Sequence, residues 1–438
     1  MRNAIERWKA IVLCSVMFCL PEVVLAEQGT SCDSVPHPSG YAENLLRSGS
    51  YSRYPELTEN VGSAGVYIPH RFIHRLGIEA RPQYVFPTNP FLQGENERWK
   101  PVQASFAAHL KYSFKFRPNT CADRIYGGAY QGVGVSFSTF GDKKQLGDPF
   151  SFYVFQGARI ARFSSRVSLN YEWNFGLSAG WKPYDNYYNT YNGAVGSRMN
   201  AYINAGVYVN WAFSRYFDLI VGGDFTHFSN GNTKYPNAGI NTTGAKIGVV
   251  YNFNRTEEDL SKPFCQPVVT RFPRHISYDV VLFGSWRRKG VWVGEKQIAS
   301  PNAYPVAGFN FAPMYNLSYK LRVGASLDGV YDGSANVYRE DVIVEYGSSS
   351  SKREFLKPGI QHQLALGLSA RAEYVMPYFT IGVGMGANVL SRGDMRGFYQ
   401  ILALKIDITR SSFLHIGYNL QDFQTPNYLM LGLGFRFH

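Results

Sequence analysis

A long alternation of apolar and polar residues constrains this chain more than any other feature of its sequence. In "RVSLNYEWNFGLSAGW" (166–181), the odd positions from Val167 to Trp181 are all apolar, and the even positions to Ser178 are polar or glycine. Successive side chains of a β-strand point to opposite faces, so a period of two predicts strands with one apolar and one polar face. The same pattern recurs in 72–86 and 429–437. The chain is therefore expected to be all-β.

Strand length and aromatic content favour a membrane barrel over a soluble β-sandwich, which also alternates. Many runs reach 10 to 15 residues, which exceeds the usual soluble strand of about 5 to 6 and suits a tilted membrane strand of about 9 to 11. Aromatic residues make up 16% of the chain and lie near strand ends, as interfacial girdles do. Open sheet edges do not occur in lipid. We therefore expect a transmembrane antiparallel β-barrel.

The strands fall into two groups separated by a linker. Eight are expected before Asn254, near 71–86, 104–116, 126–139, 149–163, 166–181, 199–214, 216–230 and 236–253. Prolines, charges and a cysteine then interrupt the alternation over 254–275, which predicts a periplasmic linker. About eight further strands are possible in 276–438. The eight-stranded unit of 70–253 is thus followed either by a second barrel or by the continuation of one barrel of about 16 strands.

The first 26 residues have the form of an export signal. Arg2, Arg7 and Lys9 give a basic start, an apolar run follows over 10–20, and "VLA" ends at Ala26. A membrane anchor is the alternative, but the apolar run is shorter than the roughly 20 residues that a spanning helix needs. Residues 27–69 are then expected to form a periplasmic N-terminal segment, and the barrel to lie in the outer membrane of a Gram-negative-type cell.

The mature chain is basic and has no pattern typical of nucleic-acid binding or zinc binding. Loss of the signal removes three basic and two acidic side chains, so the formal net charge falls from +12 to +11. This charge suits phosphate-rich partners, and export makes anionic lipid headgroups the expected ones. Lys and Arg are scattered rather than clustered, and no Cys/His group has zinc spacing, so neither nucleic acid nor a structural metal is expected.

Three cysteines remain after the signal is removed, in a compartment where disulfides persist. With the amino end in the periplasm, Cys121 lies in the periplasmic turn after the second strand, and Cys265 lies in the linker. We predict a disulfide between these two. Unpaired cysteines in loops are the alternative, since spacing alone does not fix connectivity.

The stretch "FTHFSNGNTKYPNAGINTTG" (225–244) places two reactive side chains on the lipid-facing side of the expected barrel. In the strand 216–230 the odd positions are mainly apolar and face lipid, so His227 and Ser229 face lipid as well. Asp224 has the opposite parity and faces the interior. If the hairpin folds about Lys234, Asn241 lies directly across from His227. The three polar side chains would then meet at the outer end of the barrel, before an extracellular hairpin.

This arrangement has the parts of a nucleophilic site. Ser229 would attack, His227 would take and return the proton, and Asn241 would orient the imidazole. The loop amides at Asn230 and Gly231, or the Asn230 side chain, would stabilise a tetrahedral oxyanion. The alternative is an ordinary polar strand end that enters a loop rich in Asn and Gly.

The segment "HFSNGNTKYPNAGIN" (227–241) resembles the catalytic hairpin of the outer-membrane lipid A 3-O-deacylase (PagL-type) family. That family has His-x-Ser-Asn, then Pro-Asn-x-Gly, then the third member of the triad, and these motifs match here, with Asn237 supporting the site. The family's eight-stranded barrel corresponds to about 70–253, and we identify no counterpart for the region beyond the linker. One position departs from the family pattern, because Asn241 stands where the family has glutamate.

The resemblance implies an outer-membrane serine esterase that removes an ester-linked acyl chain from lipid A or a related lipid. Lys234 would attract a lipid A phosphate, and the acyl chain would lie along Phe225 and Tyr251. No metal or organic cofactor is required, and lipopolysaccharide in the outer leaflet is the expected partner. The alternative is a non-enzymatic barrel with a structural or transport role. The sequence leaves the acyl chain removed and the oligomeric state open.

Overall fold

The structure is a computed structural model and describes 72–118, 120–261, 268–288, 290–293, 296–299, 302–339, 355–356, 358–422 and 425–438. The expected signal peptide (1–26), the segment 27–69 and Cys265 lie outside these residues.

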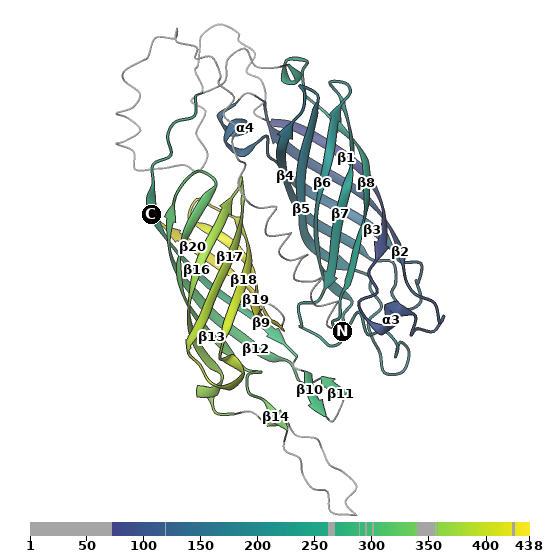
Figure 1. Ribbon diagram of the computed structural model, residues 1–438, viewed down its shortest axis with the longest axis vertical. Coiled ribbons are helices and arrows are strands. Elements are labelled where there is room, and N and C mark those ends of the chain that lie inside the picture. Colours follow the sequence, from purple (N-terminus) through teal and green to yellow (C-terminus); the bar gives the residue numbers. More distant parts are fainter. Residues whose placement is uncertain are drawn as a thin grey trace, which may run out of the picture.

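The first half of the chain forms a closed antiparallel barrel of eight strands in sequence order. The strands are β1 (Phe72–Val85), β2 (Ala104–Phe116), β3 (Tyr130–Thr139), β4 (Phe150–Arg162), β5 (Val167–Ala179), β6 (Met199–Ala212), β7 (Phe217–Ser229) and β8 (Ile240–Asn252). The barrel closes because β1 pairs with β8 as well as with β2. The short helices α3 (Pro90–Gln93) and α4 (Cys121–Tyr126) lie at opposite ends of it (Figure 1).

The second half forms another closed barrel of eight antiparallel strands. These are β9 (His275–Arg287), β12 (Tyr304–Asn316), β13 (Leu321–Asp332), β16 (Leu364–Val375), β17 (Phe379–Leu390), β18 (Phe398–Asp407), β19 (Ser412–Gln421) and β20 (Thr425–Phe437). Its connections carry the short pairs β10 (Gly290–Val293) with β11 (Lys296–Ala299) and β14 (Tyr338–Arg339) with β15 (Phe355–Leu356). The turns η1 (Glu258–Leu260), η2 (Ile360–His362) and η3 (Gly393–Met395) complete the described elements.

The two closures decide between the two architectures that the sequence left open. β20 pairs with β9, so the second set of strands closes on itself and shares no strand with the first. The expectation of a transmembrane barrel unit followed by a second barrel is confirmed, and the single barrel of about 16 strands is wrong. Figure 1 shows the two barrels lying side by side.

Two strands begin later than the alternation predicts, for local reasons. Before β3 the chain forms α4, whose N-cap Thr120 accepts a hydrogen bond from the backbone N–H of Asp123, and the left-handed Gly127 ends the helix. Before β8, Gly239 has a φ of +71°, so the strand starts only at Ile240.

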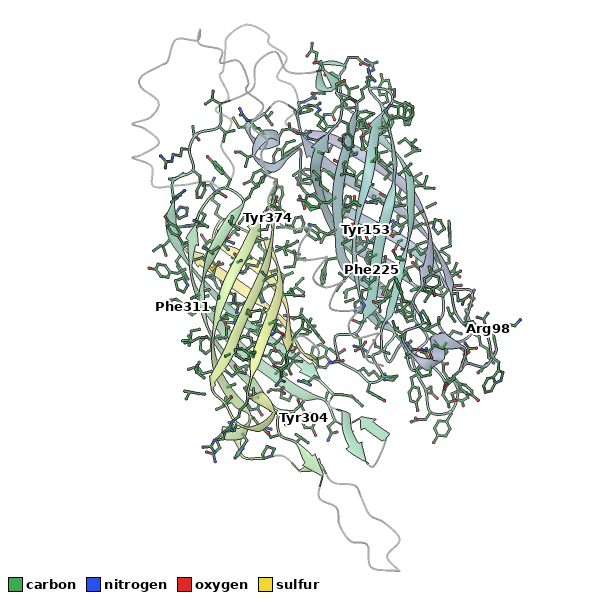
Figure 2. All side chains as sticks on the ribbon, in the orientation of Figure 1. Arg98, Tyr153, Phe225, Tyr304, Phe311 and Tyr374 are labelled. Atoms are coloured by element: carbon green, nitrogen blue, oxygen red, sulfur yellow. The ribbon has the colours of Figure 1, made fainter. Side chains whose placement is uncertain are left out.

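The alternation places polar side chains inside each barrel and apolar side chains outside. In β7 the buried residues include Asp218, Asp224 and Thr226, while Val221 on the other face is 49% exposed. Phe311 of the second barrel is 42% exposed, and Figure 2 shows side chains standing outward along both walls. An apolar outer face with a polar interior is typical of a membrane barrel. No helix within the described residues is long and apolar enough to cross a membrane.

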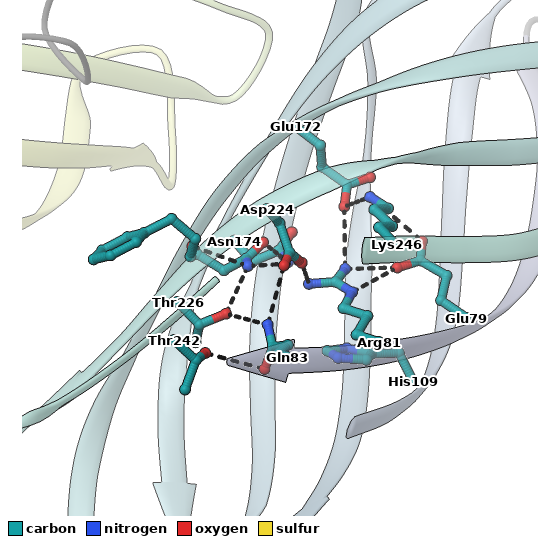
Figure 3. A network of polar contacts seen from close by, with 12 residues as sticks. Glu79, Arg81, Gln83, His109, Glu172, Asn174, Asp224, Thr226, Thr242 and Lys246 are labelled. Atoms are coloured by element: carbon teal, nitrogen blue, oxygen red, sulfur yellow. Dashed lines mark hydrogen bonds and ion pairs between the residues drawn. The ribbon is translucent and has the colours of Figure 1, made fainter. Parts of the chain in front are cut away.

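Paired charges fill the interior of the first barrel. The guanidinium of Arg81 lies 2.6 Å from the carboxylates of both Glu79 and Asp224 (Figure 3). Lys246 bonds to Glu172 at 2.7 Å, and Lys111 bonds to Glu79 at 2.9 Å. Buried charges are tolerated when they are paired and hydrogen-bonded. The network lies beside a buried apolar cluster that includes Phe155, Ile220 and Phe228.

The second barrel uses the same device. Lys405 bonds to Asp279 at 2.8 Å, and Arg436 bonds to both oxygens of Asp279 at 2.7 Å. The cavities found inside the two barrels measure about 20 and 10 Å³. Such volumes hold about one water molecule each. Charged and polar side chains therefore occupy both described interiors.

Candidate active site

The end of β7 is anchored by an inward aromatic side chain between the two candidate reactive residues. Phe228 is buried and packs against Trp181, Tyr202 and Phe140, with ring centroids 5.1, 5.5 and 6.0 Å away. Because neighbouring strand residues point to opposite faces, this inward anchor fixes the residues on either side of it outward. His227 and Ser229 are both half-buried on that outer face.

His227 lies directly across the hairpin from Asn241, as the alternation predicts. The two residues are paired in the β7–β8 register, and Nδ1 of His227 lies 2.6 Å from Oδ1 of Asn241. An amide oxygen only accepts hydrogen bonds, so Nδ1 carries the proton and Nε2 keeps a free lone pair. The contact therefore sets the tautomer that a general base requires.

The Asn241 side chain is almost completely enclosed. It is 1% exposed, and its Nδ2 has no hydrogen-bond partner among the described residues. A buried donor without a partner costs free energy. The Asn241 amide thus contacts His227 through Oδ1 alone. Its Nδ2 lies where a glutamate or aspartate carboxylate would have its second oxygen.

Ser229 lies on the same outer face as His227, two residues further along β7. Two residues along a strand span about 6.6 Å, and the described contacts include no hydrogen bond between the Ser229 hydroxyl and His227. Catalytic hydrogen bonds are often long in a site without substrate and tighten when substrate binds. The orientation of the two side chains suits a nucleophile and a base that come together on a bound ester.

Gly239 lies against both residues, a role that the motif alone did not reveal. Its φ is +71°, and a Cβ at this position would lie 3.2 Å from Cε1 of His227 and 3.7 Å from Cβ of Ser229. The Gly239 amide donates to the carbonyl of Ala194 in the β5–β6 connection, at 3.1 Å. The positive φ of Gly239 and its closeness to the His227 ring identify this role, and both are known only from the structure.

The hairpin loop is held by its own asparagines. The backbone N–H of Asn230 donates to Oδ1 of Asn237 at 2.9 Å, and Nδ2 of Asn230 donates to the carbonyl of Lys234 at 2.8 Å. Nδ2 of Asn237 donates to Oδ1 of Asn232 at 3.2 Å. Both N–H donors assigned to Asn230 at the oxyanion are thus already engaged within the loop. The Gly231 amide makes no hydrogen bond within the described part of the chain. It is therefore the candidate oxyanion donor that could bind without first breaking a hydrogen bond in the loop.

The remaining expected site residues divide between the two ends of the barrel. Lys234 is exposed at the hairpin, where a headgroup phosphate can reach it. Tyr251 pairs with Phe217 at the other end of β8, ten residues from Asn241. That separation is about 33 Å along the strand, comparable with the whole hydrocarbon thickness. The expectation that one acyl chain reaches both Phe225 and Tyr251 is therefore wrong, and Phe225 remains.

Asp224 is excluded from the site, as its parity predicts. Its carboxylate faces the interior, where it bonds to Arg81 at 2.6 Å and accepts a hydrogen bond from Nε2 of Gln83 at 3.0 Å. Asn241, and not Asp224, is thus the side chain that hydrogen-bonds to His227. Within the described ranges no cluster of His, Cys, Asp or Glu has a geometry that holds a metal ion.

The predicted disulfide remains a prediction. Cys121 opens α4, is half-buried and forms no disulfide with a described residue, and its Sγ lies 3.7 Å from the carbonyl oxygen of Val268. Cys265 stands three residues before Val268 but lies outside the described residues.

Comparison with solved structures returns bacterial outer-membrane barrels at low identity. Neisserial surface protein A is 11% identical, with 41% of this chain and 97% of that chain covered and a TM-score of 0.28. The outer membrane enzyme PagL is 15% identical, with 40% and 98% covered and a TM-score of 0.26. Omp33 of Acinetobacter baumannii is 8% identical, with 84% and 98% covered and a TM-score of 0.15. No curated protein sequence matches the chain.

Family models match both halves of the chain. Residues 106–250 match lipid A 3-O-deacylase (PagL), and residues 276–438 match the acyloxyacyl hydrolase C-terminal domain. The absence of a counterpart for the region beyond the linker is thereby corrected, because a family domain covers it to the last residue. The chain therefore carries a lipid A 3-O-deacylase (PagL) domain in its first barrel and an acyloxyacyl hydrolase C-terminal domain in its second.

Proposed function

We propose that this protein is an outer-membrane serine esterase that hydrolyses an ester-linked acyl chain of lipid A. Family membership implies an ester hydrolase with lipid A as its substrate. The observation that carries the assignment of residues is the 2.6 Å contact between His227 Nδ1 and Asn241 Oδ1, on the same outer face as Ser229.

In the first half of the reaction, Oγ of Ser229 attacks the ester carbonyl carbon while Nε2 of His227 takes the hydroxyl proton. The carbonyl oxygen becomes an oxyanion, which the Gly231 amide N–H stabilises by a hydrogen bond. The tetrahedral intermediate then breaks the bond to the sugar oxygen. His227 returns its proton to that oxygen, so the deacylated lipid leaves as an alcohol and the acyl chain stays on Ser229.

In the second half, water attacks the acyl-enzyme and His227 takes a proton from it. The bond to Ser229 breaks, the serine recovers its proton, and a free fatty acid leaves. Asn241 keeps the imidazole in the required tautomer through both halves, although an amide cannot stabilise the imidazolium with a full charge as glutamate does. We infer that this enzyme is slower than a relative with glutamate at the position of Asn241.

The surroundings of the site suit a membrane lipid. The reacting residues face outward at one end of the barrel, so the ester of an outer-leaflet lipid reaches Ser229 without entering a pore. Phe225 lies outward next to His227 in the same strand and offers apolar contact to the acyl chain. The exposed Lys234 attracts the lipid A phosphates.

The test is mass spectrometry of lipid A from cells that make the wild-type protein or Ser229→Ala. Wild type should remove one 3-position fatty acid, and Ser229→Ala should leave lipid A intact. Ser411→Ala is the matched control, because Ser411 is an exposed serine in the β18–β19 turn of the second barrel. Identical spectra from wild type and Ser229→Ala would refute the assignment and favour a non-enzymatic barrel.

A further inference from the structure

The loop that follows Ser229 touches the second barrel. A Cβ on Gly231 would lie 3.5 Å from Cε2 of Tyr418 and 4.0 Å from Leu429. Tyr418 and Leu429 are cross-strand partners in β19 and β20, and both lie on the outer face of their barrel. The backbone N–H of Arg288, which follows β9, also donates to the carbonyl of Asn232 at 3.3 Å. Three segments of the second barrel therefore meet the hairpin that carries the candidate nucleophile.

The barrels touch again at β5. Trp173 and Phe175 pack against the buried cluster Met376, Phe379 and Leu404 of the second barrel. The rings of Trp173 and Phe379 lie 5.1 Å apart at 88°, an edge-to-face contact. Barrel strands tilt by about 35 to 45° from the axis, so a neighbour that touches the middle of β5 can also reach the end of β7.

A strip of exposed apolar side chains on β6 lies between this contact and the reactive residues. Phe175, Ile203 and His227 are aligned in register across β5, β6 and β7 on the same outer face. Ile203 is 42% exposed, and Met199 and Val207 on the same face are 56% and 36% exposed. The strip is thus flanked by the second barrel on one side and by His227 and Ser229 on the other, and neither covers it.

We propose that the second barrel forms the far wall of the acyl-chain site. The acyl chain of the lipid substrate lies along the outer face of β6, with Ser229 and His227 on one side and the second barrel on the other. Tyr418 and Leu429 close the end of the site nearest the ester. This inference rests on the proposed function and adds a role for the second barrel in it.

The chemistry of the surface identifies the occupant. The strip presents only apolar side chains, and it belongs to the outer face of a membrane barrel, where the surrounding medium is hydrocarbon. An acyl chain held between two walls is ordered when it binds. It therefore loses less conformational entropy at the reaction step than an acyl chain on an open surface does. A second wall therefore raises the rate for long chains and does little for a short ester.

The first experiment removes the wall. The double variant Tyr418→Ala/Leu429→Ala is compared with Leu414→Ala/Leu433→Ala, a matched outward pair on the same two strands away from the hairpin. Purified full-length proteins are assayed on lipid A and on p-nitrophenyl butyrate, with Ser229→Ala as the inactive reference. The wall variant should lower kcat/KM on lipid A by about tenfold, the scale of losing a few apolar contacts, and leave the short ester unchanged. The control pair should change neither.

The second experiment blocks the strip. Ala205→Trp puts a large side chain on the exposed outer face of β6, and Ala245→Trp puts the same side chain on the exposed outer face of β8. Only Ala205→Trp should slow the reaction on lipid A, again with the short ester spared. Equal effects of the two tryptophans would overturn the proposed path.

The outcomes distinguish a failure of this inference from a failure of the proposed esterase function. If Ser229→Ala is inactive and the wall variant matches wild type on lipid A, the inference fails and the function stands. If Ser229→Ala retains full activity on both substrates, both fail. Retained heat-modifiable migration of unheated samples on gels confirms that each variant is a folded barrel.

Discussion

The two barrels have the same architecture and differ in what their last hairpins present to the membrane. In β7 and β8 the outward pair nearest the hairpin is His227 with Asn241, whereas the outward pair of β19 and β20 that faces this hairpin is Tyr418 with Leu429. Both barrels close with eight strands and hold buried ion pairs inside. Closure and interior are thus common to both barrels, and the chemistry that we propose depends on a few outward side chains at one rim of the first.

One histidine in each barrel offers the strongest test of this comparison. His227 faces outward at the rim of the first barrel, and His415 is buried inside the second. His227→Gln should lower kcat on lipid A by at least about 1000-fold, because the general base is lost. His415→Gln should keep activity within about twofold. Steady-state kinetics measures both, and a large loss in His415→Gln in a folded protein would contradict the division of labour.

Glycines give the next largest effect. Gly239→Ala combines a positive φ with a Cβ placed 3.2 Å from the His227 ring, and kcat should fall by about 10- to 100-fold as the ring is displaced. Gly141→Ala is the matched control, since Gly141 has a φ of +69° with no atom within 4 Å of its Cβ. Its strain should lower stability by about 1–2 kcal/mol and leave kcat unchanged. Equal losses of activity would attribute the effect to backbone strain alone.

Asn241→Glu sharpens the comparison with relatives that carry glutamate. The carboxylate stabilises the imidazolium and removes the Nδ2 that has no partner among the described residues, so kcat should rise by up to about tenfold. The cost of burying a charge at a site only 1% exposed limits the gain. Asn241→Gln, which lengthens the side chain without adding charge, is the control. A higher kcat in Asn241→Gln would show that the length of the side chain, rather than its charge, limits kcat in the wild type.

The smallest effect on activity is expected inside the second barrel. Lys405→Met removes the cation between Asp279 and Glu373 and should destabilise that barrel by about 3–5 kcal/mol. Activity per folded molecule should change less than twofold. Lys246→Met makes the equivalent change in the first barrel, next to Glu172. Urea titration followed on gels measures the stability of each variant, and loss of activity in folded Lys405→Met would mean that the second interior takes part in the chemistry.

The sequence predicts which side chains share a face better than it predicts which distant segments meet. Alternation placed His227, Ser229 and Asn241 on one outer face and excluded Asp224, because side-chain direction in a strand depends only on parity. It did not distinguish two closed barrels from one, since closure depends on which distant strands pair. The contact of Gly231 with Tyr418 depends on packing between barrels, and no local pattern encodes it.

Loop hydrogen bonds were also beyond the sequence. Asn230 has several donors and acceptors, and only the folded hairpin selects Asn237 and Lys234 as partners. The role of Gly239 depends on a positive φ and on the nearby His227 ring, which residue type alone suggests but does not locate.

The closing seams of the two barrels have a consequence for assembly. β1 pairs with β8, and β9 pairs with β20, so each seam joins the two ends of its own half of the chain. An unclosed half would expose Arg81 and Lys246, or Arg436 and Lys405, to hydrocarbon, at a high cost in free energy. Closure of its own seam therefore shields the buried charges of each half, and the first half closes without a strand from the second.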